Sequence, residues 1–118
     1  GYMTDSFHYL RDDCKAVLPA DYTMLAANQI KLFANFDKMR ILEYLTLNGA
    51  SCVSDIVAGI ESEQLKVSQN LKRLRDDGFV VCHREGRYII YDITPGVHKT
   101  AIQCIHKRYD SLKNKADF

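Results

Sequence analysis

The sequence has no stretch of apolar residues long enough to cross a membrane as a helix. It also lacks the charged segment, apolar block and small-residue cleavage site that make up a secretory signal. We therefore expect a cytoplasmic protein that has no membrane partner. Gly1 and Tyr2 precede Met3 and are interpreted as residues left over from expression of the protein.

The motifs of common enzymes are missing as well. There is no glycine-rich phosphate loop, no G-x-S-x-G and no H-E-x-x-H. The two acidic pairs, Asp12-Asp13 and Asp76-Asp77, consist of neighbours that point in different directions on a helix, so they do not form a carboxylate pair for acid–base chemistry. We predict that the chain is not an enzyme and has no catalytic residues.

What is present fits one small domain with a short arm. The chain has 118 residues, of which 47% are hydrophobic, and no repeat or low-complexity segment. Apolar residues recur at helical spacing over about 5–17, and Pro19 ends that segment because proline cannot continue the preceding turn. We interpret residues 1–20 as an N-terminal arm. Asp37 is expected to cap the helix that carries the apolar residues after it.

Amphipathic helices are expected near both ends of the remaining chain. One covers about residues 22–35 with Asp21 as its N-cap, and the other covers about 95–114, entered through Thr94-Pro95. In a monomer one of their apolar stripes would be partly exposed to water, so we expect that stripe to be buried against a second copy of the chain. The predicted dimer-interface residues are Leu25, Phe33, Ala101, Ile102, Ile105, Tyr109 and Leu112.

The most informative stretch is residues 56–91. Val67, Leu71 and Leu74 recur at i, i+4 and i+7, which predicts the buried face of a helix over about 63–77. Polar and basic residues occupy its other faces. Between residues 62 and 75 there are four basic residues and one acidic residue, a local charge of +3 in a chain of net charge +1.

A hairpin is predicted directly after this helix. Gly78 fits the left-handed residue that ends a helix. Runs of β-branched and aromatic residues over 79–84 and 87–93 flank Glu85-Gly86, which predicts two strands joined by a two-residue loop.

A short helix, a turn, a polar-faced helix and an arginine-tipped hairpin, in this order, are typical of a winged helix-turn-helix that reads double-stranded DNA. The predicted fold class is mainly α with a small β-hairpin, an α-α-α-α-β-β-α winged helix domain over residues 21–118 preceded by the arm. Amide, hydroxyl and cationic side chains suit base edges and phosphates. The predicted DNA contacts are Gln64, Leu65, Lys66, Ser68, Gln69, Lys72, Arg73, Arg84 and Arg87.

The same surface has other interpretations. A basic helix face is often only solvated, and a winged helix can serve as a protein–protein interaction module without specific DNA binding. Leu65 fits two roles equally well: contact with a thymine methyl group, or cover for a neighbouring side chain. Binding that weakens steeply with salt would distinguish DNA recognition from protein docking.

Residues 39–42, 52–56, 67–80 and 84–91 together resemble the ArsR/SmtB family of small bacterial and archaeal repressors. The resemblance covers about residues 24–112. It implies a homodimer built on the first and last helices of the domain, an operator of inverted half-sites, and release from DNA when an inducer binds. It also implies that Gln64, Leu65, Ser68 and Gln69 face the major groove.

The sequence alone leaves the identity of the inducer open. The four cysteines show no C-x-x-C, and a disulfide framework is not expected in a cytosolic chain. The family's thiolate metal site has two cysteines one residue apart where this chain reads Cys52-Val53-Ser54, and serine is a poor ligand for soft metals. Cys14 in the arm could supply a second sulfur. Cys14 and Cys52 are thus the candidate sensing pair.

Three alternatives stay open for this pair: a thiophilic metal ion, a thiol oxidant or reactive sulfur species, or no inducer at all. Cys52 is expected at a helix N-terminus, where free N–H groups stabilise a thiolate. No cofactor is otherwise predicted. Cys82 is expected to fill the core, and Cys104 and His106 lie on opposite sides of the last helix's stripe.

The family's second zinc site, on the last helix, would use residues from both protomers. His98 could match one ligand, but Tyr109 and Leu112 stand at the later positions, and neither suits zinc. We predict that this site is absent and that His98 is a hydrogen-bonded interface residue.

Overall fold

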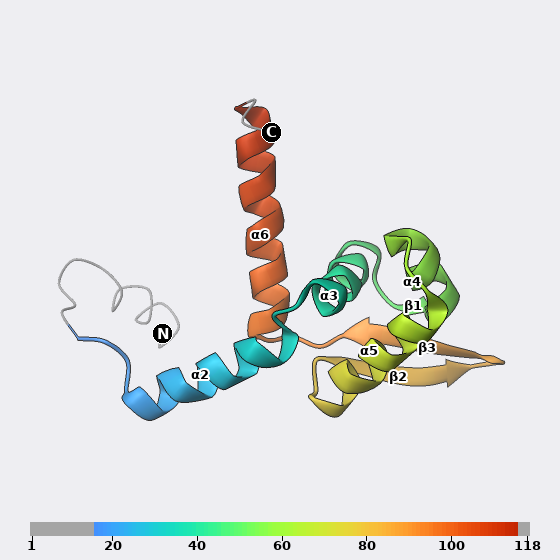
Figure 1. Ribbon diagram of the computed structural model, residues 1–118, viewed down its shortest axis with the longest axis horizontal. Coiled ribbons are helices and arrows are strands. Elements are labelled where there is room, and N and C mark those ends of the chain that lie inside the picture. Colours follow the sequence, from blue (N-terminus) through green and yellow to red (C-terminus); the bar gives the residue numbers. More distant parts are fainter. Residues whose placement is uncertain (1–15, 116–118) are drawn as a thin grey trace.

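The structure, a computed structural model, describes residues 16–115. That range contains five helices and a three-stranded antiparallel sheet (Figure 1). In chain order the elements are α2 (Ala20–Phe33), α3 (Phe36–Asn48), β1 (Ser51–Cys52), α4 (Val53–Ile60), α5 (Gln64–Asp76), β2 (Val80–Glu85), β3 (Tyr88–Ile93) and α6 (Val97–Asn114). This is the predicted winged helix-turn-helix order, with one strand more. Most of the predicted arm helix lies outside the described residues.

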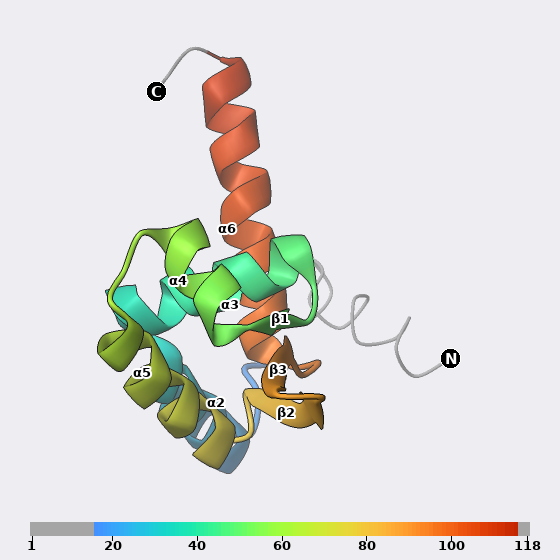
Figure 2. The same ribbon diagram turned by 90° about the vertical axis from the view of Figure 1, so that its right-hand side faces the viewer.

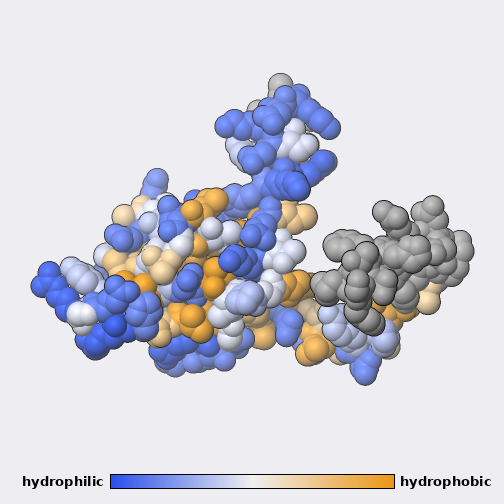
Figure 3. Space-filling model, turned by 180° about the vertical axis from the view of Figure 1, so that it is seen from behind, coloured by the Kyte–Doolittle hydropathy of each residue, from blue (hydrophilic) through white to orange (hydrophobic). Residues whose placement is uncertain are grey.

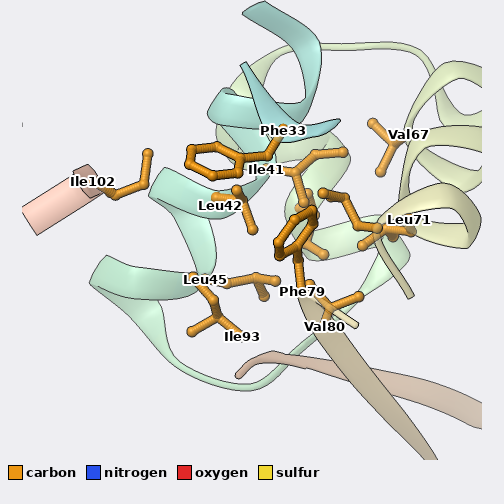
Figure 4. Close-up of a cluster of buried hydrophobic side chains, with 12 residues drawn as sticks. Phe33, Ile41, Leu42, Leu45, Val67, Leu71, Phe79, Val80, Ile93 and Ile102 are labelled. Carbon is orange, nitrogen blue, oxygen red and sulfur yellow. The ribbon is translucent and has the colours of Figure 1, made fainter. Parts of the chain in front are cut away.

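The core forms where α3, α4 and α5 meet the root of the sheet. Val67, Leu71 and Leu74 of α5 are at most 1% exposed, so the predicted buried face is confirmed. They belong to one cluster with apolar residues of α3 and of the strands (Figure 4). Burying a side chain of this size stabilises the fold by about 1.5–3 kcal/mol. The cluster contains Phe33, Ile41, Leu42, Leu45, Ile56, Val67, Leu71, Leu74, Phe79, Val80, Ile93 and Ile102.

The sheet differs from the predicted hairpin in two details. The strand order is β1-β3-β2, because Ser51 and Cys52 pair with Tyr91 and Ile90 of β3. The two-residue loop is Gly86-Arg87, one residue later than predicted, since Glu85 pairs with Tyr88. Gly86 has a φ of 62°, a backbone conformation that glycine adopts without steric cost.

Helices α2 and α6 extend away from the core. In Figures 1 and 2 α6 rises from the body, and in Figure 1 α2 points away from α5 and the sheet. Of the α2 residues only Phe33 is buried. Apolar residues therefore show on the surface of the body and along α2, while the outer half of α6 is hydrophilic (Figure 3). Across residues 16–115, no helix is both long and apolar enough to pass through a bilayer.

Three helix starts differ from the predicted ones. Helix α2 begins at Ala20, after Pro19, so Asp21 lies in its first turn and is not its cap. Helix α3 is capped by Asn35, whose Oδ1 accepts a hydrogen bond from Lys38 N at 2.9 Å, and not by Asp37. Asn35 has an extended backbone, which places its short side chain over the free N–H groups.

The last helix also begins later than predicted. Helix α6 starts at Val97 with Gly96 as its N-cap, so Thr94 and Pro95 precede it. Thr94 instead donates its hydroxyl to the carbonyl of Gly78 at 2.8 Å, which ties the end of β3 to the start of β2.

His98 joins α2, the wing and α6. It is 3% exposed, and its ring lies 6.2 Å from the ring of Phe33 and 4.8 Å from that of Phe79, measured between centroids. Its Nε2 is 3.1 Å from Thr94 Oγ1. His98 is thus hydrogen-bonded, as predicted, but in the chain's own core and not at an interface. Burial lowers the pKa of His98, because the charged ring would lose its hydration.

The lowered pKa gives a pH dependence of stability. His98 binds a proton more readily in the unfolded chain than in the folded chain. The free energy of unfolding should therefore fall as pH drops below about 6.5. We expect His98→Gln to be less stable than the parent at neutral pH, and to lose less stability between about pH 7 and about pH 5. Urea unfolding at both pH values measures this. Equal pH dependence in the two proteins would show that His98 does not control it.

Candidate nucleic-acid interface

Helices α4 and α5 form the helix-turn-helix, joined by residues 61–63. Glu61 carries a φ of 54°, and it is the only residue other than glycine within 16–115 with a left-handed backbone. This conformation costs a residue with a Cβ roughly 1–2 kcal/mol. The turn is closed by a hydrogen bond from Ser62 N to Val57 O at 3.1 Å. A turn held in this way fixes the angle at which α5 leaves the core.

The outer surface of α5 is polar and accessible. Since Val67, Leu71 and Leu74 face the core, the residues between them are turned to solvent, and Leu65 is 69% exposed. An exposed leucine among amides and cations is available for apolar contact with a base. All nine residues predicted to contact DNA are exposed: Gln64, Leu65, Lys66, Ser68, Gln69, Lys72, Arg73, Arg84 and Arg87.

Two lysines of α5 form ion pairs with carboxylates of this chain. Lys66 Nζ lies 3.8 Å from Asp37 Oδ1, in the first turn of α3. Lys72 Nζ lies 3.5 Å from Asp76 Oδ2, one turn further along α5. All four side chains are 43% exposed or more, so each pair is weak and can be exchanged for another partner.

The wing carries its own cations. Arg84 Nη1 donates to the carbonyl of Gly86 at 3.4 Å, which holds the guanidinium at the loop. Arg87 Nη2 donates to the hydroxyl of Tyr88 at 3.3 Å, and the same guanidinium stands 5.3 Å from the centre of that ring. On the strand leading to the loop, His83 Nε2 is 2.7 Å from Glu85 Oε2.

Arg75 connects the end of α5 to the first wing strand. Its Nη1 donates to Cys82 Sγ at 3.7 Å, and this hydrogen bond raises the pKa of Arg75 further above its ordinary high value. Cys82 is partly exposed, so the prediction that it fills the core is wrong. The contact adds a cation between helix and wing.

Cys52 occupies the N-cap position of α4, as predicted. Its Sγ is 3.2 Å from Ser54 Oγ. Both residues line a shallow hollow of about 380 Å³, which is also bordered by Asp55 and by Tyr88 and Ile90 of the wing. A group bound to the Cys52 thiol would therefore touch both the helix-turn-helix and the wing. Cys14, the second member of the predicted pair, lies outside the described residues.

The other two cysteines within residues 16–115 lie on β2 and α6. Cys104 is exposed on α6, and Cys52, Cys82 and Cys104 are all free thiols. His106 Nε2 is 3.1 Å from Glu43 Oε1 of α3, so it links the two helices. Within the described range, no three His, Cys, Asp or Glu side chains are grouped as metal ligands would be.

The predicted dimer-interface residues divide into two groups. Phe33 and Ile102 are 3% and 0% exposed and belong to the core of this chain, so they have no surface left for a partner. Leu25 and Ile105 are about half exposed, at 53% and 47%. The amphipathic pattern correctly predicted that Phe33 and Ile102 are buried. They are buried by this chain and not by a second copy. The accessible members are Leu25, Ala101, Ile105, Tyr109 and Leu112.

Sequence reasoning missed several contacts of this surface. The pair between Lys72 and Asp76 has a local signal, because residues four apart on a helix are neighbours. No such signal exists for the pair between Lys66 and Asp37, which brings together two different helices.

Comparisons with known proteins identify relatives that share this architecture. No protein-family model matches the chain. The chain is 31% identical over 80 residues to the transcriptional activator HlyU of Vibrio cholerae, covering 68% of this chain and 73% of that protein. It is 30% identical over 80 residues to the HTH-type transcriptional regulator MJ1325 of Methanocaldococcus jannaschii, covering 68% and 90%.

A third relative, the arsenical resistance operon repressor of Escherichia coli, is 24% identical over 92 residues, covering 78% of this chain and 79% of that protein. Among solved structures, the antimony-specific repressor AntR superposes with a TM-score of 0.77 at 23% identity, covering 89% and 93%. The homodimeric winged helix-turn-helix domain of Mb0332 from Mycobacterium bovis superposes with a TM-score of 0.62 at 24% identity, covering 81% and 91%.

The fold and its exposed recognition helix define a winged helix-turn-helix transcriptional regulator. The chain belongs to the ArsR/SmtB family of DNA-binding regulators. Its relatives are regulators of transcription and not enzymes, in agreement with the absence of catalytic motifs from the sequence.

Proposed function

We propose that the chain is a homodimeric repressor that binds an inverted-repeat operator through α5 and the wing, and that an inducer acting at cysteine releases it. The observation that carries the proposal is the outer face of α5. Its predicted contact residues are all exposed, while the opposite face is locked into the core. Recognition helices enter the major groove with such a face, and the wing arginines would contact phosphate or lie in the adjacent minor groove.

Exposed apolar residues on α2 and α6 support a dimer. Tyr22, Met24 and Leu25 of α2 are each more than half exposed, and Ile105 of α6 is 47% exposed. A second copy would cover them through a two-fold contact. The two copies of α5 would then reach successive major grooves, about 34 Å apart. The Mb0332 domain, which has this fold, is described as homodimeric.

Repression with release by a thiol-directed inducer is supported by Cys52 and by the relatives. Two similar proteins are described as an arsenical resistance repressor and an antimony-specific repressor. In this chain Ser54 stands beside Cys52, so a soft metal or metalloid would need another sulfur, for which Cys14 is the candidate. An oxidant or reactive sulfur species would likewise need Cys14 as resolving thiol.

DNA binding should depend on ionic strength and on the α5 cations. Lys72→Ala or Arg73→Ala should weaken binding to duplex DNA, and affinity of the parent should fall about 10³–10⁵-fold between about 50 and about 200 mM salt if six to ten phosphates are contacted. Fluorescence anisotropy with duplexes from the region upstream of the chain's own gene measures both effects. Lys113→Ala, at the far end of α6, is the matched control and should leave affinity nearly unchanged.

The alternative is a protein–protein interaction module that uses the wing or α5 as a docking surface. It predicts no specific duplex binding at low salt, and that result would make us abandon the repressor. Retention of full affinity by both cation variants would locate the DNA contact elsewhere on the chain.

A charge on the exposed stripe should separate the protomers. Ile105→Asp would bury an unpaired carboxylate in the dimer, which costs several kcal/mol. We expect a shift from dimer to monomer in sedimentation experiments, together with loss of operator affinity. Gln103→Asp, on the same helix and exposed, should remain dimeric. A parent chain that sediments as a monomer at micromolar concentration would exclude the dimer.

The inducer should act through Cys52 and Cys14. Operator complexes of the parent, Cys14→Ser and Cys52→Ser are titrated with thiophilic metal ions and with thiol oxidants while anisotropy is followed. We expect one class of reagent to release the parent from DNA and to act at least tenfold more weakly on both variants. Cys104→Ser serves as the control for an exposed thiol on α6. An unchanged response in Cys14→Ser and Cys52→Ser would eliminate this pair as the sensor.

A further inference from the structure

Two carboxylates of this chain form ion pairs with lysines of the recognition helix. Asp37 reaches Lys66 from α3, at 3.8 Å between Nζ and Oδ1, and Asp76 reaches Lys72 from within α5, at 3.5 Å. Both cations are among the residues proposed to contact DNA. A carboxylate beside each ammonium group offsets part of its charge and competes with phosphate for its N–H donors.

The two pairs sit at different places on the interface. Lys66 lies in the first turn of α5, the part of a recognition helix that inserts deepest into the groove. Lys72 lies near the other end, six residues later, or about 9 Å along the helix axis. Because the pairs share no partner, their effects on binding should be nearly independent.

The free energy of DNA binding should be less favourable with these carboxylates than without them. The attraction of each pair is lost when the lysine moves to DNA, and the remaining carboxylate then faces the phosphate backbone. An exposed pair contributes little, so each effect is modest. It is also independent of base sequence, because phosphate contacts carry no direct sequence information.

We propose that Asp37 and Asp76 act as intramolecular competitors of DNA phosphate and lower the affinity of the regulator for all duplexes by the same factor. The effect reduces retention on random DNA without altering base readout. This inference rests on the proposed function, because it requires that Lys66 and Lys72 contact DNA.

The test compares Asp37→Asn, Asp76→Asn and the double variant with the parent protein. Anisotropy is measured on a random-sequence duplex and on a duplex from upstream of the chain's own gene, at about 50 and about 200 mM salt. We expect each single variant to bind about two- to fivefold more tightly at the lower salt, by the same factor on both duplexes. The double variant should show the product of the two factors. The gain should shrink at the higher salt, where exposed pairs are screened.

Two controls separate this effect from net charge. Asp110→Asn on α6 makes the same charge change away from α5 and should leave affinity unchanged within twofold. In a Lys66→Gln background, Asp37→Asn should give a smaller gain, because the competing pair no longer exists. For Asp37→Asn, a change in stability cannot imitate the gain, since removal of the acidic group from the first turn of α3 would lower affinity through unfolding.

The outcomes distinguish the two proposals. A parent chain that binds neither duplex overturns both. A parent that binds while Asp37→Asn and Asp76→Asn bind equally tightly overturns the competition alone. A gain confined to one duplex, or one undiminished by Lys66→Gln, also contradicts the competition, since it would indicate base readout by the lysine or general charge repulsion.

Discussion

Burial of one face of α5 is the constraint on which the rest of the structure depends. Val67, Leu71 and Leu74 enter the core against α3 and the root of the sheet, and the helix can satisfy this contact in only one rotation. A turn of about 100° would place cations in the core, where an unpaired charge is far more costly than an exposed leucine. The orientation of the exposed polar face of α5 is therefore determined by the residues of its buried face.

Positive charge of the chain is gathered on α5 and the wing. The chain carries nearly equal numbers of acidic and basic residues, so its long-range attraction to nucleic acid is small. Attraction arises locally, where α5 and the wing gather cations, and several of these already contact a carboxylate, a carbonyl, an aromatic ring or a thiol. Several cations of this surface thus have contacts within the chain in the absence of any partner.

Local patterns in the sequence predicted local structure well. The helix expected over 63–77 is α5, Gln64–Asp76, because its period and its stop at Gly78 are encoded by neighbouring residues. The added strand β1 was missed, since its two residues pair with a segment far along the chain. The loop was misplaced by one residue because Glu85-Gly86 and Gly86-Arg87 both contain the required glycine. Phe33 and Ile102 were assigned to a dimer because periodicity reports that a face is buried, but not by which chain.

The short strand β1 has a mechanical consequence. It pairs Cys52, at the start of α4, with Ile90 of the wing, so the helix-turn-helix and the hairpin are joined through one sheet. Moving one part relative to the other would break the pairing between β1 and β3. A change in the orientation of α4 would therefore be passed to the wing through the paired backbones of β1 and β3.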